Sequence, residues 1–292
     1  MSFAGTYTAL VTPFRDGAFD RKAFRGLIES QIEGGVEGIV PVGTTGESPT
    51  LTFEEHTEVI QVAIEAAKGR CKVIAGTGSN STNEAIFLTV EAEKLGADAA
   101  LVVAPYYNKP SQEGLYRHYR AIAEAVSIPI VLYSIPGRCG IEIGVETVVR
   151  LANDCPGIVC IKEAGGSVER VSQLRQVVPD AFEILSGDDS LTLPFLSAGG
   201  VGVISVASNL IPRDVSGFVR AWRAGRTQEA VDAHRRFYRL FKDLFVEPNP
   251  VPIKYALSLR GALSAEVRLP LCEMSDSNKD KLRSTLSALK LL

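Results

Sequence analysis

The segment Gly157-Ile158-Val159-Cys160-Ile161-Lys162-Glu163 decides the fold of this chain. Four apolar residues run directly into Lys162, with Pro156-Gly157 before the run and Gly165-Gly166 soon after it. A short, uniformly apolar run that is rich in β-branched residues and bounded by turn formers is typical of a buried strand in a parallel sheet. The sequence therefore predicts a strand whose C-terminal end carries Lys162.

Lys162 stands where α/β folds place their ligand sites, at the carboxyl end of a strand. A buried ammonium group without a partner is too costly to keep, so the residue is either functional or paired. Removal from water favours the neutral amine, which is a nucleophile toward carbonyl groups. Two other interpretations remain open at this point. The side chain could extend its head to solvent, or it could pair with Glu163.

The rest of the chain repeats a strand followed by a helix. Regular alternation of this kind indicates a parallel sheet, and eight strands are the number that closes a (β/α)8 TIM barrel. We therefore predict the α/β class with this barrel as its architecture. The predicted strands are residues 6–11, 38–42, 73–75, 99–103, 129–133, 157–162, 182–186 and 202–205.

An open, doubly wound sheet is the alternative architecture. It would usually carry a dinucleotide fingerprint after the first strand, and Val11-Thr12-Pro13-Phe14 is not one. Gly76-Thr77-Gly78 supplies only half of that fingerprint and follows the third strand. From about Pro212 the pattern is wholly helical, without a linker. We expect a catalytic barrel over residues 1–225 and a C-terminal helical region, 226–292, packed on it.

Composition excludes several classes of function. Of the 292 residues, 46% are hydrophobic and 22% are charged, as in an ordinary globular protein. The net charge of −3 gives no electrostatic footprint for nucleic acid. No apolar run approaches the length of a membrane span, and the N-terminus lacks the pattern of a signal peptide. We expect neither nucleic acid nor a membrane among its partners.

Cysteine and histidine usage bears on metals and on the compartment. The five cysteines are an odd number, scattered, with no Cys-x-x-Cys pair. Only three histidines are present, and they are far apart in the sequence. Disulfide frameworks and zinc sites are therefore not expected, and a reducing cytoplasm is the default location. We expect no metal and no cofactor.

Polar residues gather after the predicted strands, at positions that converge on one mouth of a barrel. They comprise an amine, phenols, two hydroxyls and an arginine, a set suited to carbonyl chemistry. The amine forms a Schiff base, the phenol and a hydroxyl relay protons, and the guanidinium holds a carboxylate. The residues are Thr44, Thr45, Tyr106, Tyr107, Tyr133, Arg138, Lys162, Gly187 and Asp188.

Four motifs in this order resemble the dihydrodipicolinate synthase family, also named 4-hydroxy-tetrahydrodipicolinate synthase. That family belongs to the N-acetylneuraminate lyase group of class I aldolases. The resemblance covers essentially the whole chain and implies condensation of pyruvate with L-aspartate 4-semialdehyde, on the diaminopimelate route to lysine. The motifs are Gly43-Thr44-Thr45-Gly46-Glu47, Pro105-Tyr106-Tyr107-Asn108-Lys109-Pro110, Tyr133-Ser134-Ile135-Pro136-Gly137-Arg138 and Ile161-Lys162-Glu163.

The resemblance also implies a role for each site residue. Lys162 would form the Schiff base, and Tyr133 would donate and accept protons. Thr44 and Tyr107 would complete the proton relay, with Tyr107 reaching in from a neighbouring subunit. The substrate-binding residues would be Thr45 for the pyruvate carboxylate, Arg138 for the semialdehyde carboxylate, and the backbones of Gly187 and Ile204 for the pyruvate pocket. Each residue also has an alternative without a catalytic role. Thr44-Thr45 could form an ordinary turn, Tyr133 could be a half-buried core residue, and Arg138 could belong to a surface ion pair.

Two other functions are compatible with parts of this pattern. N-acetylneuraminate lyases and 2-keto-3-deoxy-sugar-acid aldolases or dehydratases of the same group share the tyrosine and the lysine. They generally lack the arginine two residues after the proline, so Arg138 favours a small anionic aldehyde. A regulatory protein that binds carboxylates on a barrel scaffold would need neither Lys162 nor Tyr133.

Some members of the resembled family are inhibited by lysine at a dimer interface. A carboxylate and an amide would bind the ammonium group there, with hydroxyls beside them. Glu84 could instead stabilise a helix start, which is common for an acidic residue in that position. The resemblance also implies a homotetramer built as a dimer of dimers. The candidate residues for this allosteric lysine site are Ser48, His56, Asn80, Glu84 and Tyr106.

Overall fold

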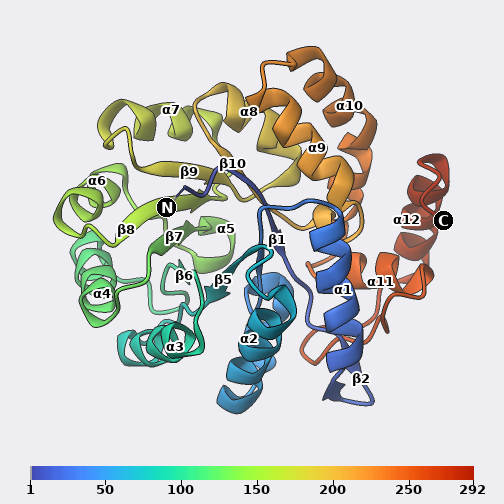
Figure 1. Ribbon diagram of the computed structural model, residues 1–292, viewed down its shortest axis with the longest axis horizontal. Helices are drawn as coiled ribbons and strands as arrows, with labels where there is room; N and C mark the ends of the chain where they lie inside the picture. Colours follow the sequence, from blue (N-terminus) through green and yellow to red (C-terminus); the bar gives the residue numbers. More distant parts are fainter. Residues whose placement is uncertain (1) are drawn as a thin grey trace. The chain divides into compact units, whose positions relative to one another are not determined.

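The computed structural model describes residues 2–292. Its eight parallel strands form a closed barrel in the order β1-β10-β9-β8-β7-β6-β5-β4 (Figure 1). The predicted (β/α)8 barrel is therefore confirmed. The barrel strands are β1 (Gly5–Ala9), β4 (Gly38–Val40), β5 (Lys72–Gly76), β6 (Ala99–Val103), β7 (Ile130–Ser134), β8 (Ile158–Glu163), β9 (Glu183–Ser186) and β10 (Gly202–Ser205). Their ends differ from the predicted ones by about two residues at most, which is the usual uncertainty of such boundaries.

Helices follow the strands along the chain, and the C-terminal part is helical as the sequence predicts. A two-stranded antiparallel hairpin, β2 (Phe14–Arg15) with β3 (Ala18–Phe19), was not expected from the sequence. The helices are α1 (Arg21–Glu33), α2 (Phe53–Ala67), α3 (Thr82–Leu95), α4 (Gln112–Ala125), α5 (Pro136–Cys139), α6 (Val145–Asp154), α7 (Val168–Val177), α8 (Thr192–Ser197), α9 (Pro212–Arg223), α10 (Thr227–Asp243), α11 (Val251–Leu259) and α12 (Asp276–Ala288).

The chain divides into two compact units. The first unit contains residues 2–5 and Val73–Ile204, and thus most of β5, all of β6 to β9 and most of β10. The second unit contains Thr6–Lys72 and Ser205–Leu292. The boundary near residue 225, between a catalytic barrel and a helical region, stays a prediction.

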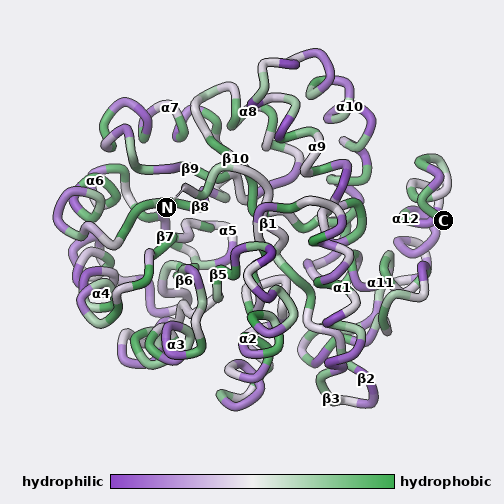
Figure 2. The backbone as a smooth tube through the Cα atoms, in the orientation of Figure 1, coloured by the Kyte–Doolittle hydropathy of each residue, from purple (hydrophilic) through white to green (hydrophobic). Residues whose placement is uncertain are grey.

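The core of the first unit lies between β6, β7 and β8 and the helices that cover them. Leu132, Ile161 and Ile184 are fully buried there, together with Leu115 of α4. Uniformly apolar strands with both faces covered are what parallel sheets require. In Figure 2, the tube of α4 changes between hydrophobic green and hydrophilic purple along its length, as expected for a helix that packs one face on the strands.

Local capping explains where the helices of the second unit begin. The Asp20 carboxylate accepts a hydrogen bond of 2.9 Å from the Ala23 amide and so caps the N-terminus of α1. At the start of α2, Thr52 and Glu55 form a reciprocal capping box. Of the helices within residues 2–292, none combines the length and the apolar character that a membrane span requires.

Candidate active site

Lys162 lies at the next-to-last position of β8, and its side chain is inside the first unit. The residue is 6% exposed, so the interpretation in which the head extends to solvent does not hold. Its Nζ lies 4.0 Å from the centroid of the Tyr133 ring. Tyr133 is the residue paired with Lys162 on the neighbouring strand β7, and it is 5% exposed. The amine therefore lies against the face of an aromatic ring whose hydroxyl is the phenol that the sequence singled out.

Glu163 is not the partner of Lys162. Successive side chains of a strand point to opposite faces, so Glu163 points away from the side that holds Lys162. Its Oε2 accepts a hydrogen bond of 2.7 Å from Arg170 Nε, and its Oε1 accepts one of 2.7 Å from the Gly165 amide. Burial raises the pKa of Glu163, and the Arg170 guanidinium opposes that rise. No pattern in the sequence indicates that Arg170 is the partner of Glu163.

Gly187 provides the space that the Lys162 side chain occupies. It follows β9, and its amide donates a hydrogen bond of 2.8 Å to the Glu163 carbonyl. A Cβ at this position would lie 3.0 Å from Lys162 Cε and 2.6 Å from Ala164 Cβ. Only glycine fits there without displacement of its neighbours. Ile204 lies on β10, the strand next to β9, and is 1% exposed.

Arg138 is carried by the loop that follows Tyr133. The loop contains the short helix α5, Pro136–Cys139, which is followed by Gly140 with a φ of 72°. Proline at the first position and a left-handed glycine after the last one are standard helix limits. Arg138 is exposed on this helix. The same loop brings Gly140 against the Lys109 side chain, since a Cβ on Gly140 would lie 2.8 Å from Lys109 Cε.

Tyr107 is the most exposed large hydrophobic residue among those described, at 89%. Its φ is 70°, a conformation that costs a bulky residue roughly 1–2 kcal/mol. Neighbouring contacts hold the segment: Asn108 Nδ2 donates to the Asn80 carbonyl at 2.9 Å, and Asn80 Nδ2 donates to the Tyr106 carbonyl at 3.2 Å. The ring is thus held away from the first unit rather than packed into it.

Thr44 and Thr45 follow β4 in the second unit, in the short 3-10 helix Thr44–Gly46. Thr45 is 3% exposed, and its Oγ1 accepts a hydrogen bond of 2.9 Å from Asn249 Nδ2. Because a hydroxyl carries one proton and this oxygen already accepts, the Thr45 proton can be donated to an acceptor such as a carboxylate.

Glu47 closes the same motif and forms a buried ion pair that sequence reasoning missed. Its Oε1 lies 2.6 Å from Lys254 Nζ, and the two side chains are 1% and 0% exposed. Its Oε2 accepts a hydrogen bond of 3.0 Å from the Arg268 amide. Burial lowers the pKa of Lys254, and the Glu47 carboxylate opposes this shift. Lys254 has a carboxylate partner and thus serves the structure, whereas Lys162 has none within residues 2–292.

The candidates for a lysine site come from both units. In the first unit, Asn80 and Tyr106 are joined by the hydrogen bond described above, and Glu84 lies in the first turn of α3 after the N-cap Ser81. Ser48 lies in the 3-10 helix Ser48–Thr50 of the second unit, and His56 is buried in α2. Glu84 therefore lies where an acidic side chain stabilises the start of a helix, so this alternative to a role in lysine binding stays open.

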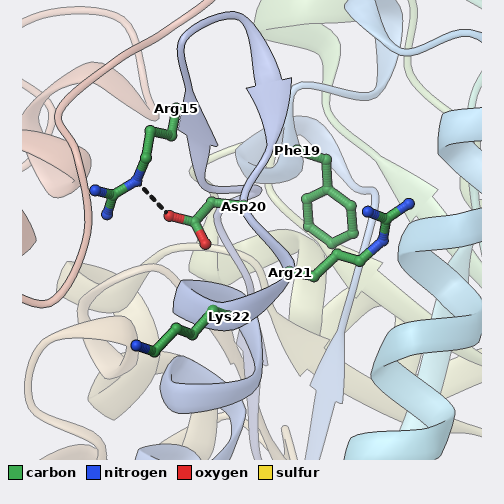
Figure 3. Close-up of a pocket in the computed structure, with 5 residues that line it drawn as sticks. All are labelled: Arg15, Phe19, Asp20, Arg21 and Lys22. Carbon is green, nitrogen blue, oxygen red and sulfur yellow. Dashed lines mark hydrogen bonds and ion pairs between the residues drawn. The ribbon is translucent and has the colours of Figure 1, made fainter.

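A separate hollow lies beside the hairpin and the start of α1 (Figure 3). In Figure 3, Arg15 and Lys22 lie on one side of it, and Phe19 and Arg21 lie on the other. Arg15 Nε lies 2.9 Å from an Asp20 oxygen, and Arg21 pairs with Glu58. Because these guanidinium groups already have carboxylate partners and no catalytic candidate lines the hollow, we assign it no function.

Over almost its whole length, the chain is similar to proteins whose activity is known. The model of the dihydrodipicolinate synthetase family matches residues 2–289. The 4-hydroxy-tetrahydrodipicolinate synthase of Endomicrobium trichonymphae is 52% identical over 290 residues, which cover 99% of each chain. The structure of the corresponding synthase from the methanotroph Methylacidiphilum fumariolicum SolV is similar with a TM-score of 0.98 at 57% identity, covering 99% of this chain and 96% of that one. The crystal structure of DHDPS from Cyanidioschyzon merolae with lysine bound has a TM-score of 0.96 at 45% identity, covering 99% of each chain.

Proposed function

This chain belongs to the dihydrodipicolinate synthetase family, and we propose that it condenses pyruvate with L-aspartate 4-semialdehyde to give 4-hydroxy-tetrahydrodipicolinate. It is an enzyme of lysine and diaminopimelate biosynthesis. The observation that carries the proposed chemistry is the buried Lys162 amine, which lies 4.0 Å from the centre of the Tyr133 ring. A buried amine without a carboxylate partner, next to a phenol, is the arrangement that Schiff-base chemistry needs.

The reaction begins with addition of the Lys162 amine to the C2 carbonyl of pyruvate. The carbinolamine that forms must gain a proton on its oxygen before water leaves and the protonated imine appears. Tyr133 is the phenol beside the amine, and we assign this proton transfer to its hydroxyl. Thr44 and Tyr107 would connect Tyr133 to solvent as further members of the relay.

Carbon–carbon bond formation follows from the imine. Loss of a proton from C3 gives the enamine, because the protonated imine accepts the electron pair of the broken C–H bond. The enamine carbon attacks the aldehyde carbon of the semialdehyde, and the aldehyde oxygen takes up a proton. The amino group of the second substrate then adds to C2 and displaces the Lys162 amine, which closes the ring. The overall reaction releases water, and the amine returns to its starting form.

Three contacts would bind the substrates. The Thr45 hydroxyl, whose oxygen accepts from Asn249, can donate its proton to the pyruvate carboxylate. Arg138 would bind the semialdehyde carboxylate from α5, where its side chain is exposed. Gly187 leaves room beside Lys162, and Ile204 would bound the pyruvate pocket from β10.

The exposed Tyr107 supports an assembly in which it enters a neighbouring protomer. Tyrosine is enriched at protein interfaces because its ring is apolar and its hydroxyl can find a partner there, and the Tyr107 ring is 89% exposed in the single chain. We propose a homotetramer in the cytoplasm, with Tyr107 contributed across the contact. Sedimentation equilibrium would measure the assembly, and a Tyr107→Ala variant that kept full activity would contradict the shared site.

We also propose that lysine binds at Asn80, Glu84 and Tyr106, together with Ser48 and His56. Support comes from the relative of Cyanidioschyzon merolae, whose structure has lysine bound. The carboxylate of Glu84 suits the ammonium group of such a ligand. Rates measured with increasing lysine would test this, with Glu84→Gln as the variant expected to weaken inhibition.

Borohydride reduction in the presence of pyruvate tests the central proposal. We expect a pyruvate-sized adduct on the peptide that contains Lys162, and no adduct in Lys162→Ala. An assay with aspartate semialdehyde then separates this activity from that of a sugar-acid aldolase, which would accept a longer polyol acid instead. An adduct on another lysine, or none at all, would refute the proposed chemistry.

A further inference from the structure

A second polar cluster lies on the outer side of the strand end that carries Lys162. Its centre is Arg170, in the first turn of α7, whose side chain is 6% exposed. A guanidinium carries several donors in a fixed planar fork and can hold separate partners in a fixed geometry. Because Lys162 and Glu163 are adjacent on β8, this cluster begins one residue from the reactive amine.

Arg170 binds two different segments of the first unit at once. Toward β8, its Nε donates to Glu163 Oε2 at 2.7 Å, and Glu163 is fully buried. Toward the loop after β7, an Nη nitrogen donates to the Ile143 carbonyl, and another lies 3.2 Å from a Glu142 oxygen. Arg170 thus connects the end of the Schiff-base strand to the segment that follows α5.

The loop bound in this way is the one that carries Arg138. It leaves β7 at Ser134 and returns at Ile143, whose amide lies 3.5 Å from Ser134 Oγ. Gln112 of α4 holds the same end of the loop, because its Nε2 donates to the Glu142 carbonyl at 2.9 Å and its Oε1 accepts from the Gly144 amide at 2.8 Å. The base of the loop is therefore held by Arg170 and Gln112, while α5 with Arg138 lies between the held ends.

Close packing couples the two loops further. A Cβ at Gly165, in the loop after β8, would lie 2.7 Å from Glu163 Oε1, 3.3 Å from Glu142 Oε1 and 3.5 Å from Pro136 Cγ. Pro136 is the first residue of α5. The loop that leaves the Schiff-base strand thus lies directly against the start of the helix that carries Arg138. A displacement of either loop is transmitted to the other through this contact.

We propose that Arg170 is a positioning residue for the second substrate: through Glu163 and Ile143 it fixes the loop that presents Arg138 relative to the Lys162 strand. The inference rests on the proposed function of Arg138. Arg170 itself faces away from the amine side of β8 and takes no part in proton transfer. Its effect is on capture of the anionic aldehyde, because a displaced guanidinium loses the paired geometry that binds a carboxylate.

The test compares steady-state kinetics of Arg170→Lys with those of the unaltered enzyme. Lysine keeps the charge but lacks the planar fork, so it cannot hold Glu163 and Ile143 together. We expect the KM for aspartate semialdehyde to rise about tenfold to a hundredfold, the loss typical of a binding group misplaced by roughly 1 Å. The KM for pyruvate and borohydride trapping on Lys162 should stay unchanged. Equal losses for both substrates, or no change for either, would overturn the inference.

Two further variants separate positioning from general stability. Arg175→Lys on the same helix is the matched control, since within residues 2–292 the side chain of Arg175 donates to the Pro179 carbonyl at 3.2 Å and to no group of the loop that carries Arg138, and its kinetics should not change. In an Arg138→Ala background, Arg170→Lys should add no further loss for the semialdehyde, because the group that it positions is gone. An additive loss in the double variant would refute the link to Arg138.

If Arg170→Lys does not give folded protein, Glu142→Gln carries the same test. The Glu142 side chain is 45% exposed, so its replacement leaves the buried pair of Arg170 and Glu163 intact. The variant weakens the second contact between Arg170 and the loop that carries Arg138, the ion pair with Glu142, so the same substrate-selective rise in KM, smaller in size, is expected. Failure of pyruvate trapping in the unaltered enzyme would instead count against the proposed function, and so the two failures are distinguishable.

Discussion

Gly187→Ala should slow Schiff-base formation because it places a methyl group in space that the Lys162 side chain occupies. The new Cβ would lie 3.0 Å from Lys162 Cε and 2.6 Å from Ala164 Cβ. Ordinary contacts between carbon atoms begin near 3.5 Å, so about 0.5 Å of separation is missing at the lysine and about 0.9 Å at the alanine. Overpacking of this size costs roughly 1–3 kcal/mol, and the amine is the part that can yield most easily.

The expected kinetic effect follows from that displacement. A reactive group moved by up to about 1 Å loses as much as a hundredfold in rate, so kcat/KM for pyruvate should fall about tenfold to a hundredfold. Single-turnover borohydride trapping would measure the rate of adduct formation directly. Gly157→Ala is the control, because a Cβ there meets nothing within 4 Å. Trapping at the normal rate in Gly187→Ala would refute the argument that glycine is needed beside the lysine.

Three other variants test separate parts of the structure. Tyr133→Phe keeps the ring against the Lys162 amine but removes the phenolic proton, so kcat should fall about a hundredfold or more, and retention of full kcat would exclude the proton relay. Lys254→Met leaves the Glu47 carboxylate buried without its cation, which should lower the free energy of unfolding in urea by about 3–5 kcal/mol. A second change, Glu47→Gln in the same chain, should restore part of that loss, and a further loss would contradict the pairing. Burial lowers the pKa of His118 to about 4, so the unfolded state binds more protons below pH ~6.5 and stability should fall by up to about 3 kcal/mol as the pH drops from ~6.5 to ~4. His118→Gln should flatten that part of the urea profile, and an unchanged slope would show that another group causes the loss.

The sequence was sufficient for the barrel because most of its strands are short, largely apolar and bounded by turn residues. The run that ends at Lys162 forms β8, and the segment that ends at Tyr133 forms β7. Parallel pairing then brings the two residues opposite each other. This part of the candidate site follows from strand periodicity and topology, and both can be inferred from the order of residues along the chain.

The polar contacts that hold the site could not be predicted in the same way. Glu47 and Lys254 are 207 residues apart, and no local pattern links a motif glutamate with a lysine of a C-terminal helix. Arg170 resembles any basic residue in a first helical turn, where a cation is not even favoured by the helix dipole. Ion pairs of this kind depend on which side chains the fold brings together. Contacts between residues so far apart in the chain cannot be inferred from a single sequence.

The position of Lys162 within β8 also determines at which stage of local unfolding its backbone becomes exposed. Its backbone lies in a strand that is paired on both sides, with Tyr133 of β7 and Leu185 of β9. Hydrogen exchange at such an amide requires separation of central strands, so it should be among the slowest in the chain, whereas the exposed segments around Tyr107 and Arg138 should exchange early. The proposed nucleophile is thus attached to the part of the molecule that opens last, whereas Tyr107, proposed for the proton relay, and Arg138, proposed to bind the semialdehyde, are attached to parts that open first. Heating should therefore impair substrate selection at temperatures where the amine is still in place.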